Sequence, residues 1–423
     1  MPAPQRCLSR DQVARHCREH DFAEGRRATT VGLELEWLTL DRSGQRLRLE
    51  DAEAVIAEVS PRITGGRLSL EPGGQIELST FPFPDVALAC AAAAADLLAL
   101  DRACAARGIG LVALGQDPVR APERVVTAAR YRAMESYFDA LGPAGRTMMC
   151  NTAALQVNLC LGDPARQVER WRLAHQIGPA LIAAFANSPF AEGAPTGWQS
   201  SRLRTWWTLD PSRSAPVPID GDPAERWLRY ILDARVMLIR VGDDDFRALR
   251  RPMTFGQWLD QGHELGFPTI DDLVYHLTTL FPPVRPKGWL ELRMFDALPT
   301  PFWHVATAVA VALLEDPDTA AATGEAVAGT AGLWIDAARL GLAHPLLASA
   351  ASRCFELAIE SLERQRADSL AGVVAAYHDR WVARGRSPAD DRLDAWHRDG
   401  TLWPPRASPV PYAVDLDFSA VLP

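Results

Sequence analysis

The segment Val31-Gly32-Leu33-Glu34-Leu35-Glu36-Trp37 alternates apolar and acidic residues, and this alternation decides how the rest of the chain is interpreted. Successive side chains of a β-strand point to opposite faces of the sheet. A strand over residues 31–40 would therefore place Glu34 and Glu36 on one face and the apolar side chains on the other. The pattern predicts a strand with one dry face and one polar face.

Three more segments repeat this pattern, namely Gln75–Ser79, Leu155–Leu159 and Leu290–Met294. If the four strands share a sheet, its polar face gathers Glu34, Glu36, Glu77, Glu291, Gln156, Asn158 and Arg293. Carboxylates so close together repel one another and have raised pKa values unless cations lie among them. Carboxylate and amide oxygens suit Mg²⁺ or Mn²⁺, and magnesium usually binds through a few carboxylates plus substrate phosphates. We therefore expect a nucleoside triphosphate held on the sheet by divalent ions.

The alternative is that these polar faces are the solvated side of an ordinary antiparallel sheet. An exposed face normally mixes Lys, Arg, Thr and Ser with Glu. Here Glu or an amide residue recurs at the centre of all four strands and no Lys is present among them. This recurrence favours the metal site.

The remaining pattern predicts a mixed architecture. The expected elements are a first helix capped by Ser9 and Gln12, helices over Asp51–Val59, Pro84–Arg107 and Trp171–Ala186, a strand over Ile109–Leu114, a long functional loop over Glu192–Pro218, Ala/Leu-rich helices from Pro301 onward and an irregular tail over Pro404–Pro423. Strands and helices without regular βαβ alternation favour the α+β class. We expect a catalytic core over residues 1–300, with a helical part over 301–423 packed on the same core.

Composition excludes several classes of protein. The chain has 423 residues, 53 acidic against 44 basic, a net charge of −9 and 48% hydrophobic residues. This is not the composition of a disordered chain, and a net acidic protein is a poor non-specific binder of nucleic acid. No apolar stretch reaches the roughly 20 residues that span a bilayer. Seven cysteines without a CxxC pair indicate reduced thiols, and hence a cytoplasmic protein. Neither GxxxxGK[ST] nor HExxH occurs.

The segment Glu192–Pro218 is rich in arginine and tryptophan. It contains Arg202, Arg204, Arg213, Trp198, Trp206 and Trp207. Arginine binds carboxylates and phosphates through paired hydrogen bonds, and tryptophan can shape a small-molecule pocket. An arginine-rich surface loop with packed tryptophans is the alternative, and the residues alone leave both open.

Several segments, in consistent order from about residue 30 to 315, resemble the glutamate–cysteine ligases of the branch shared by plants and many bacteria. They are LEPGGQIELST (70–80), RYRAM (130–134), MMCNTAALQVNL (148–159), FANSPFAEG (185–193), RLRTWWTLDPSR (202–213), RPMTFGQWL (251–259), HLTTLFPPVRPKGWLELR (276–293) and LPTPFWHVA (298–306). The Ala- and Arg-rich composition is similar to that of actinobacterial members. In those members the ligase serves ergothioneine biosynthesis.

The resemblance implies a glutamine-synthetase-like fold, in which a curved antiparallel sheet binds ATP, metal ions and glutamate on its concave face, with helices on the outer face. It also implies roles for particular residues. The implied metal ligands are Glu34, Glu36, Glu71, Glu77 and Glu291. The implied substrate-binding residues are Gln156, Asn158, Arg130, Tyr131, Arg204 and Arg213. Arg293 and Lys287 would meet ATP, and Arg293, Arg204 and Arg213 would be the catalytic arginines.

The implied reaction has two steps. The γ-carboxylate of L-glutamate attacks the γ-phosphate of ATP, and the amine of L-cysteine then displaces phosphate from the γ-glutamyl phosphate. Three alternatives stay open at this point: ligation of glutamate to another amine, metal-dependent hydrolysis of ATP, and a module that binds MgATP without catalysis.

Overall fold

The four alternating segments lie in one antiparallel sheet. The structure, a computed structural model, describes residues 7–22, 30–242, 244–300 and 302–403. Its strands are β1 (Val31–Leu40), β2 (Gly66–Leu70), β3 (Ile76–Thr80), β4 (Gly110–Val112), β5 (Ala154–Cys160), β6 (Phe190–Ala191), β7 (Ala194–Pro195), β8 (Leu238–Arg240), β9 (Phe246–Ala248), β10 (Val284–Pro286) and β11 (Trp289–Asp296). In the described part of the chain, seven of them form the main sheet, in the order β10-β11-β5-β1-β3-β2 with β4 beside β1.

The register of the sheet brings the predicted polar side chains to one face. Every pairing in the path is antiparallel. Glu36 lies opposite Glu77 on β3, Glu34 lies opposite Gln156 on β5, and Glu291 lies opposite Asn158. The apolar residues between them are fully buried on the other face. The expectation of one sheet with a dry face and a polar face is confirmed.

The dry face is covered by helices from three parts of the chain. α3 (Val86–Arg107) packs on β1 and β3, α7 (Gly178–Phe185) on β11, and α13 (Phe302–Glu315) on β5. Because apolar side chains occupy this whole interface, the sheet and these helices share one hydrophobic core. The α+β class is thereby confirmed.

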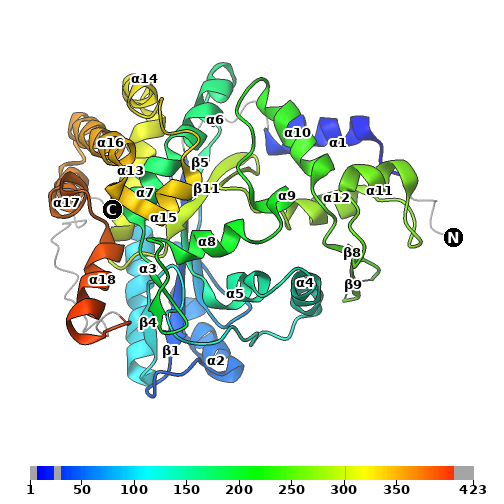
Figure 1. Ribbon diagram of the computed structural model, residues 1–423, viewed down its shortest axis with the longest axis horizontal. Coiled ribbons are helices and arrows are strands. Elements are labelled where there is room, and N and C mark those ends of the chain that lie inside the picture. The colour runs from blue at the N-terminus through cyan, green and yellow to red at the C-terminus, as the bar shows by residue number, and fades with distance from the viewer. Residues whose placement is uncertain (1–6, 23–29, 243, 301, 404–423) are drawn as a thin grey trace.

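The other helices of the first 300 residues are α1 (Arg10–His16), the π-helix η1 (Cys17–Asp21), α2 (Leu49–Val59), η2 (Ser60–Arg62), α4 (Ala129–Asp139), α5 (Ala144–Asn151), η3 (Pro164–Arg166), α6 (Gln167–Gln176), α8 (Ser201–Trp207), α9 (Pro211–Ser214), α10 (Pro223–Asp233), α11 (Phe255–Gln261) and α12 (Ile270–Leu277). Of these helices, α2 packs on α3, and α6 packs on α7, α13 and α14 (Pro317–Ala326). In Figure 1, α9 to α12 and the β8–β9 hairpin lie to one side of the strands.

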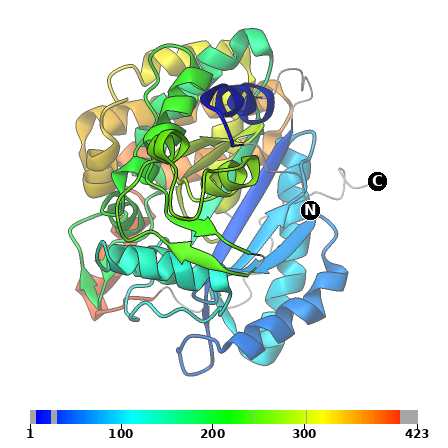
Figure 2. The same ribbon diagram turned by 90° about the vertical axis from the view of Figure 1, so that its right-hand side faces the viewer.

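The C-terminal third is helical, as expected. After α13 come α14 (Pro317–Ala326), α15 (Trp334–Leu340), η4 (Gly341–Ala343), α16 (Pro345–Arg364), α17 (Asp368–Arg380), η5 (Val382–Arg384) and α18 (Pro388–Asp399). These yellow-to-red helices lie on the opposite side of the strands from α9 to α12 (Figures 1 and 2). No helix among the described residues is both long and apolar enough to cross a membrane. The expected tail over residues 404–423 lies outside the described residues.

Local sequence signals account for many of the element boundaries. The capping box of Ser9 and Gln12 is present at the start of α1. Asp85 caps α3 by accepting a hydrogen bond from the Leu88 amide, and Gly108 ends that helix with φ of +72°, a conformation that favours glycine. The helix expected over Trp171–Ala186 is divided into α6 and α7, because Pro179 in the first turn of α7 has no amide hydrogen to continue the earlier helix.

The expectation of a long loop over Glu192–Pro218 is wrong. The segment forms β7 and two short helices, α8 and α9. Side chains at their N-termini explain why, since Ser200 accepts a hydrogen bond from the Leu203 amide and Asp210 accepts one from the Ser212 amide. The sequence pattern did not predict strand β10, because this strand is only three residues long and ends in a proline.

Hydrogen bonds hold the turn between β2 and β3 against the end of α5. The Arg46 guanidinium donates to the carbonyls of both Gly73 and Cys150, at 2.8 Å each. The Gln75 side chain accepts from the Gly73 amide and donates to Thr152 O, at 2.9 and 2.8 Å. A Cβ atom on Gly73 would lie only 2.1 Å from the Cys150 carbonyl oxygen. The turn therefore depends on glycine at this position.

We expect Gly73→Ala to destabilise the fold by about 2 kcal/mol or more, because backbone rather than a flexible side chain would have to move. Thermal or urea unfolding measures the loss. Gly324→Ala in α14 is the matched control: a Cβ there meets nothing within 4 Å, so its stability should stay level or rise slightly. Equal stability of the Gly73 variant and the wild type would contradict the tight packing of this turn.

Candidate active site

Four glutamates gather on the polar face with their charges incompletely balanced. Burial, together with the charges of Glu291 and Glu77, raises the pKa of Glu34 to about 7. Burial and the charge of Glu77 likewise raise the pKa of Glu36 to about 7. Glu71 stands at the start of the β2–β3 turn, and burial and the nearby glutamates hold its pKa well above the usual range. The face therefore binds protons where an unperturbed carboxyl would be ionised.

Amides from β5 orient these carboxylates. The Gln156 amide donates to Glu36 at 3.1 Å, and the backbone amide of Ala154 donates to the second oxygen of Glu36 at 2.8 Å. The Asn158 amide donates to Glu34 at 3.2 Å. The two amide side chains thus lie among the predicted metal ligands, which is where the sequence pattern placed them.

At the β11 end of the face, basic side chains outnumber the carboxylates. Glu291 is fully buried and accepts hydrogen bonds from Arg285 (2.6 and 3.0 Å), Lys287 (3.1 Å) and Arg293 (2.9 Å). Burial alone would raise its pKa, but these three cations lower the pKa of Glu291 well below its usual range. Both oxygens are engaged, so Glu291 would reach a metal ion only after these cations moved, and its assignment as a ligand stays a prediction.

The donor set on the β1–β3 side suits a hard divalent cation. Burial and the charges of Glu77, Glu36 and Glu34 raise the pKa of Glu71. A cation bound among these carboxylates would relieve the repulsion that raises the pKa values of Glu34, Glu36 and Glu71. Within the described ranges, no three Asp, Glu, His or Cys side chains are already arranged as they would need to be to hold a metal ion. The hydrogen bonds to Gln156, Asn158 and Ser79 would have to rearrange first.

Helix α8 places one arginine over this face, and it is Arg202. Its side chain is 3% exposed, and burial lowers the pKa of its guanidinium. Nη2 donates to the Arg293 carbonyl at 2.9 Å, whereas Nε and Nη1 are buried without a hydrogen-bond partner. The guanidinium lies 5.8 Å from the Trp206 ring centroid and is electrostatically coupled to Glu36. Arg202 is therefore poised to bind an anion.

The surroundings of Arg204 and Arg213 differ from those of Arg202. Residues two apart on a helix point about 200° apart, so Arg204 is exposed while Arg202 is buried. Arg213 is fully buried, and its guanidinium donates to Asp210, Thr279, Tyr137 and Arg235. All of its hydrogen-bonding capacity is used within the protein, so Arg213 stabilises the packing of α9, and its role in binding substrate stays a prediction.

A second set of polar groups comes from α4 and α12. The Arg130 guanidinium lies 5.8 Å from the Tyr131 ring and 5.7 Å from the Tyr275 ring. Arg130 Nε and the Tyr275 hydroxyl are both buried without a hydrogen-bond partner. Burial and the charge of Glu71 raise the pKa of Tyr131 to about 12, which connects this group to the acidic face. Arg130 and Tyr131 therefore stand beside the site, as predicted, and their role in binding substrate stays a prediction.

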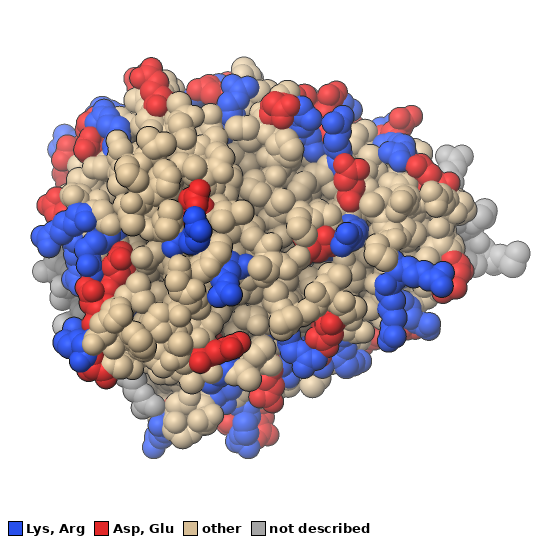
Figure 3. All heavy atoms as spheres, viewed as in Figure 1, with Lys and Arg blue, Asp and Glu red and all other residues tan. Residues whose placement is uncertain are grey.

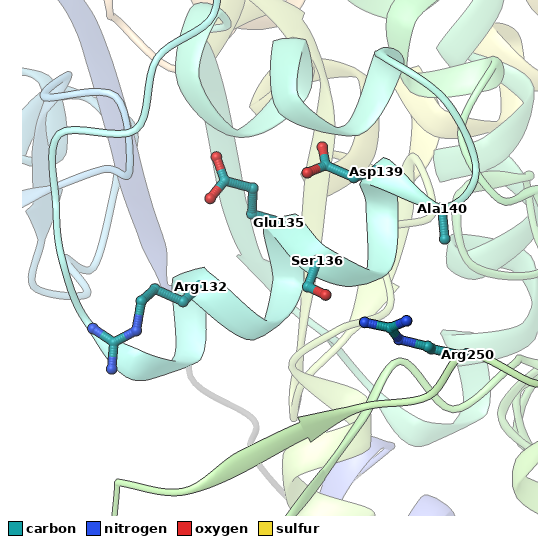
Figure 4. Close-up of a pocket in the computed structure, with 6 residues that line it drawn as sticks. All are labelled: Arg132, Glu135, Ser136, Asp139, Ala140 and Arg250. Carbon is teal, nitrogen blue, oxygen red and sulfur yellow. The ribbon is translucent and has the colours of Figure 1, made fainter.

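A polar hollow of about 440 Å³ on the outer side of α4 is separate from this constellation. Its lining residues are Arg132, Glu135, Ser136, Asp139, Ala140 and Arg250 (Figure 4). Arg132, Glu135, Ser136 and Asp139 belong to α4, Arg250 follows β9, and the buried side of α4 carries Tyr137 and Phe138. The face seen in Figure 3 mixes acidic and basic side chains and shows no continuous basic stripe.

One face of the antiparallel sheet thus gathers acidic side chains, amides and buried arginines. Residues 30–406 match the glutamate–cysteine ligase family 2 (GCS2). The chain belongs to this family, and it is an enzyme of the ligase class.

Known relatives cover nearly the whole chain. The glutamate–cysteine ligase EgtA of Mycolicibacterium smegmatis is 43% identical over 399 residues, 92% of each chain. The chloroplastic glutamate–cysteine ligase of Arabidopsis thaliana is 31% identical over 364 residues, 81% of this chain and 68% of its own. A crystal structure of the Francisella tularensis glutamate–cysteine ligase in complex with AMP superimposes with a TM-score of 0.51 at 11% identity, covering 89% and 86% of the two chains. The glutamine-synthetase-like fold implied by the resemblance is confirmed.

The raised pKa values predict how stability depends on pH. An unfolded glutamate titrates near 4.5, whereas Glu34 and Glu36 titrate near 7 in the fold, so between these values the folded state binds more protons. Their contribution to stability should therefore fall as pH rises from 4.5 to 7 and be fully lost above 7. We expect Glu36→Gln to raise the melting temperature at pH 8, on the order of 5 °C, but not at pH 4.5.

The measurement is a melting curve at each pH in EDTA, for wild type and variant. Glu50→Gln on the exposed side of α2 is the control and should show no such difference. Added Mg²⁺ should stabilise the wild type above pH 7 and should stabilise the Glu36 variant less. If the melting temperatures of wild type and Glu36→Gln differ by the same amount at both pH values, the raised pKa of Glu36 is refuted.

Proposed function

We propose that this enzyme joins the γ-carboxylate of L-glutamate to the amine of L-cysteine, with ATP and Mg²⁺, giving γ-glutamylcysteine, ADP and phosphate. The observation that carries the proposal is the placement of Arg202, with two unpartnered nitrogens, against the face that holds Glu34 and Glu36. A glutamate carboxylate needs the arginine, and a phosphate-bound cation needs the glutamates. Both requirements are met on one surface.

The acidic face supplies the cation site. Glu34, Glu36, Glu71 and Glu77 would hold Mg²⁺ or Mn²⁺, and the bound ion would supply charge neutralisation for the phosphates of ATP. Arg293, held between Glu291 and Gln156, supplies a fixed positive charge on the same face. Lys287 donates to Glu291 from the β10–β11 turn and remains the second residue proposed to meet ATP.

The chain's residues act mainly by positioning and by excluding water. The glutamate γ-carboxylate attacks the γ-phosphorus, and the bond to ADP breaks. The amine then attacks the acyl carbon, the new C–N bond forms, and phosphate leaves as the amine loses its proton. Trp206 packs against Phe281 at 5.3 Å and against Arg202 and Arg293, which gives the site an aromatic wall that shields an acyl phosphate from water.

The pathway that uses the product is proposed from the relatives. We propose that the product serves ergothioneine biosynthesis, because the relatives that are 43% identical carry the name EgtA. A cytoplasmic site of action is supported by seven cysteines that are all free thiols in the structure.

The assay that tests the proposal measures ADP release with MgATP and L-glutamate, with and without L-cysteine, and identifies the product by mass. We expect ADP release to require both amino acids and the product to have the mass of γ-glutamylcysteine. Release without cysteine would indicate hydrolysis, and release that follows another amine would change the substrate. Binding of MgATP with no release would leave a binding module and overturn the proposal.

The two arginines of α8 make a matched pair for the second test. We expect Arg202→Met to raise KM for L-glutamate about tenfold or more, because a buried charge-assisted pair with the carboxylate is lost. Arg204→Met should change KM less than twofold, since that side chain points to solvent. Steady-state kinetics with saturating ATP measure KM for L-glutamate in both variants. Equal effects of the two substitutions would contradict the placement of Arg202 at the substrate.

A further inference from the structure

Asp296, the last residue of β11, is buried where three segments of the chain meet. Its side chain is 1% exposed. One oxygen accepts hydrogen bonds from the backbone amide of Asn187 at 2.8 Å and the Ser188 hydroxyl at 2.7 Å, and the other accepts from the Ser200 hydroxyl at 2.8 Å. Ser200 is the N-cap of α8. A single carboxylate therefore joins the end of β11 to the segment after α7 and to the start of α8.

The same carboxylate forms an ion pair with Arg202. Arg202 Nη1 lies 3.9 Å from Asp296 Oδ1, which is an ion-pair distance but not a hydrogen bond. Among the described residues, the guanidinium donates a hydrogen bond to the carbonyl of Arg293, three residues earlier on β11. Strand β11 thus holds the guanidinium from one side, and Nε and Nη1 have no hydrogen-bond partner in the described part of the chain.

We infer that Asp296 is a positioning residue that acts through Arg202, fixing this guanidinium over the acidic face so that it can take the substrate carboxylate. The inference rests on the proposed function, because it assumes that Arg202 binds L-glutamate. Asp296 itself touches no substrate. It sets where α8 begins and supplies the negative charge that keeps the buried arginine in place.

Aspartate suits this position for two physical reasons. Three donors converge on it, so only a side chain with two acceptor oxygens satisfies them all. The backbone of Gly115 also lies against the carboxylate, since a Cβ on Gly115 would come 2.4 Å from Asp296 Cγ. A longer glutamate has no room here. In Asp296→Asn the new NH₂ group can face Ser200, whose hydroxyl can accept, so the variant should fold while losing its charge and turning a donor toward Arg202.

The experiment is a double-mutant cycle on Asp296 and Arg202. We expect Asp296→Asn to raise KM for L-glutamate about tenfold while KM for ATP changes less than threefold. In the Arg202→Met background the same substitution should add less than twofold, because its effect passes through Arg202. Calorimetric titration of L-glutamate in the presence of a non-hydrolysable ATP analogue gives the same comparison without turnover.

A matched control separates positioning from general destabilisation. Asp96 on α3 is equally buried and accepts hydrogen bonds from the Thr64 and Gly65 amides, away from the polar face. Asp96→Asn should lower the melting temperature and leave KM for L-glutamate unchanged. Gly115→Ala, which pushes on the Asp296 carboxylate without changing any charge, should reproduce the rise in KM for L-glutamate.

The outcomes distinguish this inference from the proposed function. If Arg202→Met leaves KM for L-glutamate unchanged, the proposed role of Arg202 fails and the inference fails with it. If Arg202→Met raises KM but Asp296→Asn does not, only the inference is overturned. Additive effects in the double variant, or equal rises in both KM values, would show that Asp296 acts on the fold as a whole.

Discussion

Repulsion among carboxylates on one face of a β-sheet is the constraint on which the rest of this structure depends. Glu36 and Glu77 lie directly opposite each other on neighbouring strands, an arrangement that destabilises a sheet unless something neutralises the charge. Two different arrangements offset this charge at the two ends of the face. At the β11 end three basic side chains surround Glu291, and at the β1–β3 end amide donors from β5 bind the carboxylates, whose pKa values are raised. The difference between the two ends divides the face into a permanently neutralised half and a half that a cation would complete.

The strands and their polar face could be predicted from the sequence because a strand's side chains alternate with a period of two. Glu34, Gln156 and Asn158 could be assigned to one face before their register was known, and the structure confirms that face. Helices with strong end signals, such as α3 between Asp85 and Gly108, were also predictable. Each of these inferences used only neighbours in the chain.

The arginines could not be assigned in the same way. In the segment around α8, choosing between Arg202 and Arg204 requires the phase of a seven-residue helix relative to the sheet, and that phase is set by Ser200 and Asp296, which are far apart in sequence. The burial of Arg213 depends on Tyr137 and Thr279, which no local pattern connects to it. The N-cap at Ser200 was the one local signal that could have revealed α8 and placed its two arginines on opposite sides.

The order of the strands in the sheet also determines when the site can exist. β5 pairs on one side with β1, where Gln156 meets Glu34, and on the other with β11, where Asn158 meets Glu291. Both pairings join residues more than a hundred positions apart, which makes their formation slow compared with local contacts. A ribosome must therefore release residues up to Asp296 before Arg293, Glu291 and the anchor of α8 can join the acidic strands. Nascent chains that end before β11 hold Glu34, Glu36, Glu71 and Glu77 without Glu291 and Arg293, so the polar face of the sheet is completed only late in synthesis.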